Sequence, residues 1–333
     1  MAERRTTVAP SPRFYEKFNT SQIIDIVTSL EVHREVPYEY SYLDTGAEQW
    51  DARARQMLTA GPGNPLTDVL ELLGTTSADL DELVGAEMMV NIVDLGVGNG
   101  LPVRPLIERY AYRGQLDRYI GLDISPEMLR IVERNIKTWF GGRIRFEGYV
   151  RDLNLHLFNG LLLAPDRTNV VVYVGGTIAN FRRLEPSLQV IRQSLGPRDV
   201  LLFALELDDE KADHSTDFTV SRPGTTELFP GRNLIELLGL EPDQYELEQF
   251  YDATERMRRV RVRVTRPLAI DVDLESHHQV VHLEPGEPVL LCRTRLLDPT
   301  EAVDLLHDNG FAVLQTAVSG NRRQLLTISR IQC

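Results

Sequence analysis

Short apolar runs and amphipathic stretches alternate along the middle of the chain. The apolar runs are NIVDL, RYIGLDI, RIRFEGYV, NVVVYVG and DVLLFALEL, all between residues 91 and 207. Between them, as in SPEMLRIVERNIKTWF, apolar residues recur at the three- to four-residue spacing of a helix. Strands that alternate with helices in this way predict βαβ units, so we expect an α/β fold with an open, doubly wound parallel sheet.

The pattern changes in residues 208–295. The segment RRVRVRV places arginine and valine at alternate positions, which is typical of antiparallel strands with one solvated face. The arginines are expected to form that solvated face, with binding of a carboxylate-rich or phosphorylated group as the alternative. A helix and two strands then complete the α/β pattern in residues 296–333, so residues 208–295 are predicted to be an inserted part of a second domain.

The N-terminal region has a third pattern of polar and apolar residues. Residues 1–12 are polar and contain prolines, which predicts a flexible tail. Residues 13–85 carry apolar positions at helical spacing and are predicted to form the N-terminal helical part of the second, substrate-binding α+β domain. The sheet domain would then consist of residues 86–207 and 296–333.

The composition narrows the possible partners. The 333 residues are 42% hydrophobic and 26% charged, with a net charge of −13. An acidic surface argues against binding to nucleic acid or to anionic membranes, so we expect a small-molecule substrate. The two cysteines, Cys292 and Cys333, offer no disulfide framework or zinc pattern, and no signal peptide or membrane span is evident. We therefore expect a cytoplasmic protein.

A glycine-rich turn follows the first apolar run, in the sequence DLGVGNG. The dinucleotide fingerprint would need a third glycine at Leu101, and the lysine of a Walker phosphate loop is absent. The form that fits is an acidic residue, Asp94, ahead of G-x-G, which is the pattern of S-adenosylmethionine (SAM) methyltransferases. Gly96, Gly98 and Asn99 are accordingly predicted to contact SAM.

Acidic residues follow the next two predicted strands. Asp123, with Ile124 after it, ends the second strand, where a carboxylate can accept both ribose hydroxyls. The alternative role for Asp123 is a helix N-cap, but Ser125 already supplies that signal. Asp152 follows the third strand and is predicted to bind the adenine amino group, with Leu153 against the ring. A solvated loop acid is the alternative.

The fourth strand ends in YVGGTIANF. Ligands of open α/β sheets bind at the carboxyl ends of the strands, and Gly175 permits close approach there. Asn180 offers both a donor and an acceptor to a ligand. The alternative is a turn with an asparagine cap.

Together, DLGVGNG, GLDIS, RDLNLHL and VGGTIANF resemble the histidine Nα-methyltransferase family of ergothioneine biosynthesis, over most of the chain from about residue 34. The resemblance implies a Rossmann-like, class I SAM-dependent methyltransferase whose second domain binds the substrate. It also implies that Asn180 grips the amine and carboxylate of an amino acid, and that Tyr40 or Tyr42 contacts the same substrate. The predicted substrate-binding set is Tyr40, Tyr42, Gly175, Asn180, Met257, Cys292 and Thr294, of which Asn180, Tyr40 and Tyr42 are the predicted catalytic residues.

The sequence also departs from the family. Cys292, with Thr294 two residues on, stands where the family has an acidic residue that holds the imidazole, and a thiol cannot pair with an imidazolium as a carboxylate does. The lysine that usually follows the glycine loop is absent, with Arg104 nearby, and ARARQML replaces the family's proline-and-tyrosine segment. These departures favour N-methylation of an amino acid or amino-acid-derived metabolite other than histidine, in secondary metabolism.

Two other hypotheses remain open at this stage. One is a methyltransferase-fold enzyme that catalyses a cyclisation or elimination, and the other is a non-catalytic partner protein. A homodimer or a protein partner is compatible with each. His277, His278 and His282 lack a carboxylate at metal-binding spacing, so no metal is expected.

Overall fold

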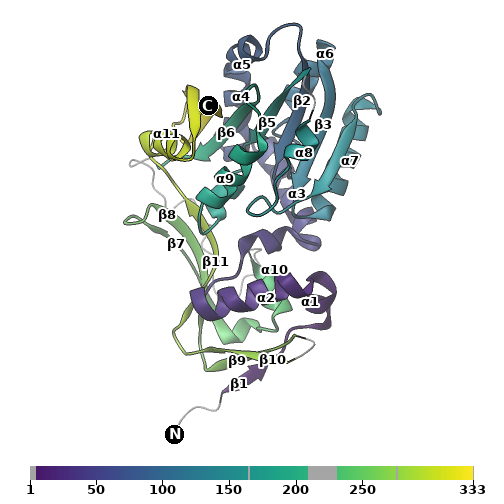
Figure 1. Cartoon of the computed structure of the whole chain (residues 1–333). Helices are drawn as coiled ribbons and strands as arrows, with labels where there is room; N and C mark the ends of the chain where they lie inside the picture. The colour runs from purple at the N-terminus through teal and green to yellow at the C-terminus, as the bar shows by residue number, and fades with distance from the viewer. Residues whose placement is uncertain (1–4, 164–165, 209–230, 275–276, 333) are drawn as a thin grey trace. The chain divides into compact units, whose positions relative to one another are not determined.

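The computed structural model describes residues 5–163, 166–208, 231–274 and 277–332. The chain divides into two compact units, which are considered separately (Figure 1). One unit comprises Met1–Ser41 and Ala212–Arg295, and the other comprises Tyr42–Lys211 and Leu296–Cys333.

The larger unit is built on a seven-stranded sheet with the order β12-β13-β6-β5-β2-β3-β4. The five strands from β6 to β4 are parallel, whereas β13 runs antiparallel to both of its neighbours. The predicted doubly wound sheet is therefore confirmed, with an antiparallel pair at one side. The strands are β2 (Met89–Leu95), β3 (Leu116–Asp123), β4 (Phe146–Val150), β5 (Arg167–Tyr173), β6 (Val200–Glu206), β12 (Phe311–Val318) and β13 (Gln324–Ile331).

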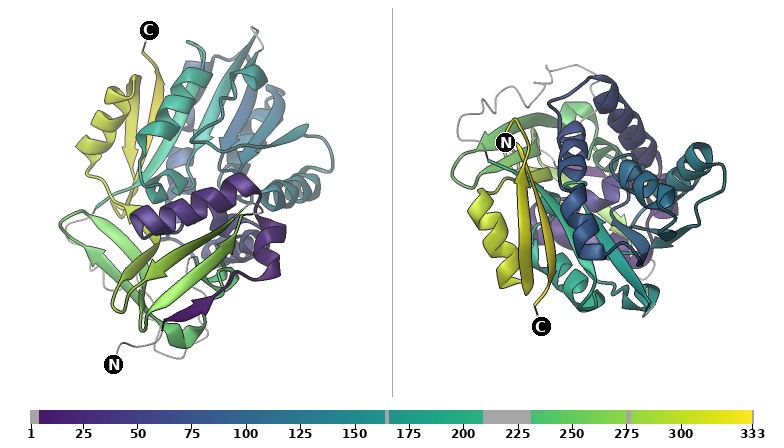
Figure 2. Two further views of the ribbon diagram at one scale, coloured as in Figure 1. Left: turned by 60° about the horizontal axis from the view of Figure 1, so that its bottom comes forward. Right: turned by 90° about the horizontal axis from the view of Figure 1, so that it is seen from above.

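Helices cover both faces of this sheet, as Figure 2 shows. Alternate residues of the central strands enter two separate cores, because side chains alternate across a strand. One core contains Val90 and Ile92 with residues of α4 to α7, and the other contains Val93 and Leu95 with residues of α8, α9 and α11. The helical elements are α3 (Thr45–Thr59), α4 (Pro65–Thr75), α5 (Ser77–Val84), α6 (Arg104–Tyr112), α7 (Pro126–Phe140), α8 (Asn159–Leu162), η3 (Thr177–Asn180), α9 (Glu185–Ser194) and α11 (Pro299–Asp308).

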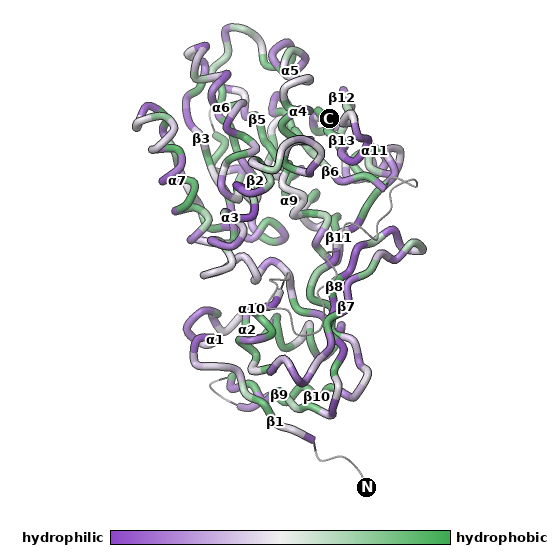
Figure 3. Tube along the Cα trace, turned by 180° about the vertical axis from the view of Figure 1, so that it is seen from behind, coloured by the Kyte–Doolittle hydropathy of each residue, from purple (hydrophilic) through white to green (hydrophobic). Residues whose placement is uncertain are grey.

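Burial on both faces explains why the central strands are continuous apolar runs. Six of the seven residues of β2 are buried, and Figure 3 colours the central strands mainly as hydrophobic. Helix α7 shows the complementary pattern, with one apolar face. The Ser125 hydroxyl caps α7 by accepting from the Met128 N–H at 3.2 Å, and Gly141 ends the helix in the left-handed conformation (φ 60°).

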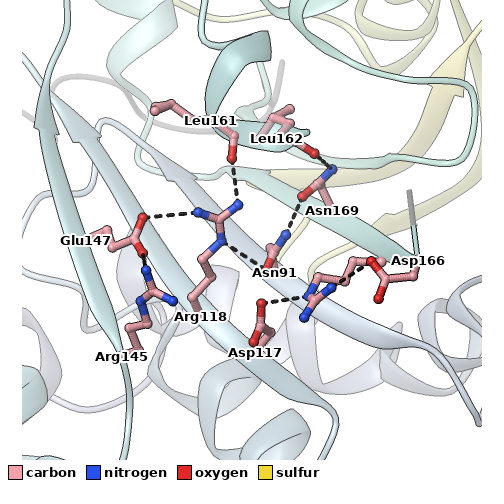
Figure 4. Close-up of polar contacts among 10 residues, drawn as sticks. Asn91, Asp117, Arg118, Arg145, Glu147, Leu161, Leu162, Asp166 and Asn169 are labelled. Atoms are coloured by element: carbon pink, nitrogen blue, oxygen red, sulfur yellow. Dashed lines mark hydrogen bonds and ion pairs between the residues drawn. The ribbon is translucent and has the colours of Figure 1, made fainter. Parts of the chain in front are cut away.

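A buried polar network crosses the sheet toward the amino-terminal ends of β2, β3 and β5 (Figure 4). The Asn91 amide donates to Asn169 Oδ1 at 2.8 Å, and the Asn169 amide donates to Asp199 Oδ1 at 2.8 Å. Arg118 extends the network by pairing with Glu147 at 3.1 Å and donating to the Leu161 carbonyl at 2.7 Å. These protein groups satisfy one another, as buried polar side chains must.

The smaller unit contains two three-stranded sheets, β11-β8-β7 and β1-β9-β10. The predicted antiparallel strands are confirmed, because β8 runs antiparallel to both β7 and β11. The elements are β1 (Thr6–Val8), α1 (Pro12–Lys17), α2 (Thr20–Thr28), η1 (Ser29–His33), η2 (Tyr38–Tyr42, which ends at the first residue of the larger unit), α10 (Arg232–Leu237), η5 (Pro242–Gln244), β7 (Tyr245–Asp252), β8 (Met257–Val264), β9 (Leu268–Asp273), β10 (His278–Leu283) and β11 (Pro288–Arg295).

Two expectations for the N-terminal region need correction. Thr6–Val8 is not a flexible tail but a strand that pairs with β9 in parallel, and pairing of this kind is invisible to local sequence patterns. Residues 42–85, predicted to belong with the second domain, cluster with the seven-stranded sheet instead. The physical reason is the apolar stripe of α4, which buries Val69 and Leu72 in the core beside β2. The expected start of the inserted part, residue 208, adjoins residues 209–230, which lie outside the described residues, and its expected end, Arg295, is the last residue of β11.

Candidate cofactor-binding site

The glycine loop follows β2 at the carboxyl edge of the seven-stranded sheet. Gly96, Gly98 and Gly100 all have positive φ, at 63°, 52° and 74°. Such a conformation strains any residue with a Cβ. At Gly98 a Cβ would also lie only 3.1 Å from the Trp50 indole nitrogen. The loop is thus a tight turn whose backbone stays bare because glycine is required at these positions.

The acid ahead of the loop lies inside the protein. Asp94 is 3% exposed, and its carboxylate accepts a 2.7 Å hydrogen bond from the Tyr119 hydroxyl. Burial raises the pKa of Asp94 well above its usual range, with the nearby Asp123 adding to the effect. Asp94 therefore anchors the end of β2 to β3.

Asp123 ends β3 beside the loop and is only 7% exposed. Its carboxylate accepts from the backbone N–H of Ser125 at 2.9 Å and from that of Gly98 at 3.4 Å. Burial raises the pKa of Asp123 to about 6, although these bonds and one from Ile124 oppose the shift. A carboxylate has about four acceptor positions, so two or three backbone donors leave capacity for a ligand's hydroxyl groups. The alternative role considered for Asp123 was the N-cap of α7. Ser125 is that N-cap.

The acid after β4 forms a local turn. Asp152 Oδ1 accepts from the Asn154 N–H at 2.8 Å, and its own N–H donates to His156 Nδ1 at 3.1 Å. Leu153 is 6% exposed and belongs to the apolar core on one face of the sheet. Both residues follow the strand next to β3, so they share the carboxyl edge with Asp123.

The turn after β5 lies at the same edge. Gly175 is exposed, and a Cβ built on it would lie 3.7 Å from the Gly96 carbonyl oxygen, so the two glycine turns approach each other closely. Asn180 ends η3 and is half-buried. The structure thus places Gly96, Gly98, Asp123, Ile124, Asp152, Leu153, Gly175 and Asn180 at or after the carboxyl ends of four neighbouring strands of one sheet, β2 to β5.

The Asn99 side chain faces the protein. Asn99 is 1% exposed, its Oδ1 accepts from the Leu101 N–H at 3.1 Å, and its amide donates to Asp51 Oδ1 at 2.8 Å. A contact from this residue to a cofactor would therefore come from its backbone. The sequence reasoning missed the helix behind this bond, because nothing in the local pattern of α3 relates Trp50 or Asp51 to a loop some 48 residues later.

The two candidate tyrosines have different surroundings. Tyr40 is 6% exposed in the smaller unit, where its hydroxyl donates to Asp25 Oδ2 at 2.8 Å and its ring packs edge-on against Phe18. Tyr42 belongs to the larger unit, half-buried, with its ring 6.0 Å from that of Trp50.

Three predicted substrate residues lie on the β11-β8-β7 sheet of the smaller unit. Cys292 is opposite Val260, and Thr294 is opposite Arg258, so these four residues share one face of the sheet. Cys292 and Met257 are buried, at 8% and 4% exposed. Met257 lies opposite Arg295, on the other face.

Arg104 and two of the candidate histidines have other partners. Arg104, near the position of the missing lysine, pairs with Glu108 at 2.8 Å and lies over the Trp139 ring, 5.0 Å from its centroid. His278 bonds Asp271 at 2.9 Å and His282 bonds Arg5 at 2.9 Å. Within the described ranges, no group of three or more His, Cys, Asp or Glu side chains is placed to hold a metal ion. None of the described helices combines the length and hydropathy that a membrane crossing requires.

The strand order, the glycine turn after β2 and the buried acid at the end of β3 define a Rossmann-like, class I SAM-dependent methyltransferase. A family model described as histidine-specific methyltransferase, SAM-dependent, matches residues 22–329. The chain belongs to this family, and it is an enzyme that uses SAM. This assignment replaces the hypothesis of a non-catalytic partner protein.

Individual relatives are distant. The histidine N-alpha-methyltransferase of Mycobacterium tuberculosis (strain CDC 1551 / Oshkosh) is 23% identical over 269 residues, which cover 79% of this chain and 71% of that protein. The solved structure of the CcbJ methyltransferase from Streptomyces caelestis is 13% identical, with a TM-score of 0.45 and coverage of 90% and 99% of the two chains. A SAM-dependent methyltransferase from Clostridium acetobutylicum ATCC 824 is 9% identical, with a TM-score of 0.45 and coverage of 86% and 99%.

Proposed function

We propose that this methyltransferase N-methylates an amino acid or an amino-acid-derived small molecule other than histidine. The observation that carries the proposal is the pairing of Cys292 with Val260 on a buried strand face. The resemblance to histidine Nα-methyltransferases puts the imidazole-binding acid at this position. A thiol opposite a valine provides no anion to pair with an imidazolium.

The surroundings of Cys292 support the same conclusion. Arg258 lies on this face, directly opposite Thr294. The pair of Arg258 and Thr294 is the next pair on the same face after that of Val260 and Cys292. None of the four side chains on this part of the face, Cys292, Val260, Thr294 and Arg258, is an acid. An acceptor with a neutral or anionic side group is compatible with a thiol, a hydroxyl and a guanidinium.

The proposed cofactor site is the carboxyl edge of the seven-stranded sheet. In the proposal, the remaining acceptor capacity of Asp123 binds the ribose hydroxyls, and Asp152 with Leu153 holds the adenine. The bare backbone of Gly96, Gly98 and Gly175 admits the methionine portion. SAM supplies an activated methyl group on a sulfonium, and the protein's contribution is to align the acceptor and exclude water.

Neutral groups position the acceptor. An amine must be deprotonated when it attacks, and an amide or a phenol can orient it without strongly stabilising the ammonium form. We assign this role to Asn180, together with Tyr42. Tyr42 is chosen over Tyr40 because Tyr42 belongs to the unit that carries Asn180 and the glycine turns, whereas the Tyr40 ring is buried against Phe18 in the smaller unit.

The direct experiment is to incubate the purified protein with SAM and a panel of amino acids and simple derivatives that includes histidine. Mass spectrometry then detects products heavier by one or more methyl groups. We expect a methylated amine product, with kcat/KM for that acceptor well above the value for histidine. Histidine as the best acceptor would contradict the proposal, and conversion of an acceptor without methyl gain would favour the cyclisation or elimination hypothesis.

A pair of variants tests the role of the thiol position. Cys292→Glu restores a carboxylate and is expected to bring histidine methylation above the wild-type level. Cys292→Gln has a similar size without the charge and is the matched control. Equal histidine activity in both variants would show that a charge at this position does not choose the acceptor.

A further inference from the structure

A closed ring of side-chain contacts joins helix α3 to the glycine loop. Asp51 Oδ1 accepts from the Asn99 amide at 2.8 Å and from Arg55 Nε at 3.0 Å. Arg55 Nη2 donates to Asn135 Oδ1 at 2.9 Å. The Asn135 amide closes the ring by donating to the Asn99 backbone carbonyl at 2.9 Å. All four residues belong to the larger unit.

Two helices of the ring hydrogen-bond the loop at the same residue. Asn99 is held through its side chain by α3 and through its backbone by α7, and it is 1% exposed. The Asn99 Oδ1 atom in turn accepts from the Leu101 N–H at 3.1 Å, which secures the residues after the turn. The neighbouring Trp50 indole nitrogen would lie 3.1 Å from a Cβ built on Gly98.

These contacts matter because the sequence of the loop does not by itself restrict it to one conformation. Three glycines with positive φ have many accessible conformations, and ordering them when a ligand binds costs conformational entropy. A loop that is ordered in advance avoids that cost at the moment of binding. Asp51 bonds both the loop residue Asn99 and Arg55, and it is the only carboxylate of the four ring residues, so both of its contacts are charge-assisted.

We propose that helix α3 is a positioning element for the cofactor. Asp51 and Arg55, through Asn99 and Asn135, hold the glycine loop in the conformation that receives SAM. Asp51 and Arg55 are thus positioning residues that act through the loop. This inference rests on the cofactor site of the proposed function and is independent of the acceptor.

The test measures the binding of S-adenosylhomocysteine by calorimetry, together with steady-state kinetics, for Asp51→Ala. Loss of a charge-assisted contact predicts that the Kd and the KM for SAM rise roughly tenfold. The kcat is expected to stay within about twofold, because the ring contains none of the residues proposed to position the acceptor. Hydrogen exchange of residues 96–101 is expected to accelerate in the variant, with exchange in β5 and β6 unchanged.

Arg55→Met serves as the second variant, because its side chain is 48% exposed and its loss threatens folding little. Glu236→Gln is the matched control, since it breaks another ion pair of i,i+4 spacing, with Arg232, in α10 of the smaller unit. Wild-type affinity in both Asp51→Ala and Arg55→Met would overturn the inference. If the wild-type protein itself binds no S-adenosylhomocysteine, the proposed cofactor site fails instead, so the two failures are distinguishable.

Discussion

The two edges of the seven-stranded sheet use buried polar side chains in different ways. Toward the amino-terminal ends of the strands, Asn91, Asn169 and Asp199 bond one another through side chains at 2.8 Å. At the carboxyl edge, Asp123 accepts bonds from backbone N–H groups, and burial raises its pKa to about 6.

This difference in hydrogen-bond partners separates a network that stabilises the fold from a site that binds a ligand. A carboxylate paired with donors throughout is stable where it is, whereas a carboxylate buried with spare acceptor capacity carries a desolvation cost in the absence of ligand. That cost is relieved when ligand hydroxyl groups donate to the carboxylate. We therefore expect the amino-terminal network to serve stability and Asp123 to serve binding, and the predictions below separate the two roles.

The largest effect is expected for Asp123→Asn. The amide is a weaker acceptor than a carboxylate, so replacing two charge-assisted bonds to the ribose should weaken S-adenosylhomocysteine binding at least 100-fold, as calorimetry would show. The variant should nonetheless be as stable as the wild type at pH 8, or more stable by up to about 3 kcal/mol, because a buried charge is removed. Lower stability with unchanged affinity would reverse the assignment of Asp123.

For Asn169→Leu we expect the opposite result, a loss of stability with no loss of cofactor affinity. This change leaves the Asn91 amide without its acceptor and removes one of the three N–H donors to the Asp199 carboxylate, in a buried region where Asn91 is 0% exposed. Unfolding in urea should show a loss of about 2–3 kcal/mol. The affinity of the folded variant for S-adenosylhomocysteine should stay at the wild-type value, and a large change in affinity would show that the two edges are coupled.

Acidification should weaken cofactor binding by about tenfold between pH 7 and pH 5. The pKa of Asp123 near 6 means that its carboxylate is mostly ionised at pH 7 and mostly protonated at pH 5, where it no longer accepts two hydroxyl donors. The stability of the ligand-free protein changes in the opposite sense for this group. The folded state binds this proton more tightly than the unfolded state, so the contribution of Asp123 becomes more favourable as the pH falls from above 6 toward 3.8. The control is Asp123→Asn, measured over the same pH range. Its cofactor affinity and stability should lack the change that comes from the titration of Asp123.

The smallest effect is expected on the arginine-rich strand of the other unit. Glu248 pairs with Arg261 and Arg263, and hydrogen bonding from Arg263 lowers the pKa of Glu248. All three side chains are about one-third exposed, so water and salt screen the pairs. Glu248→Gln should cost less than about 1 kcal/mol in unfolding free energy at 0.15 M salt. A loss as large as that of Asn169→Leu would show that burial is not what separates the two kinds of network.

The sequence alone determined the α/β class, the position of the glycine loop and the acid at the end of β3. These features are local: apolar periodicity reports burial, and a turn that needs positive φ needs glycine. The same locality identified Ser125 as the cap of α7 and the alternating strand at residues 257–264. The substrate residues on β11 came from resemblance, and their roles remain predictions.

Only the tertiary structure decided the contacts between distant segments. It placed Thr6–Val8 beside β9, gave residues 42–85 to the larger unit, and seated Asp51 against Asn99. It also showed that Asp94 lies inside and bonds Tyr119, whereas Asp123 lies beside the glycine loop and accepts from its backbone. Local patterns report only which face of an element is buried, and the identity of the neighbour that covers that face depends on how the whole chain packs.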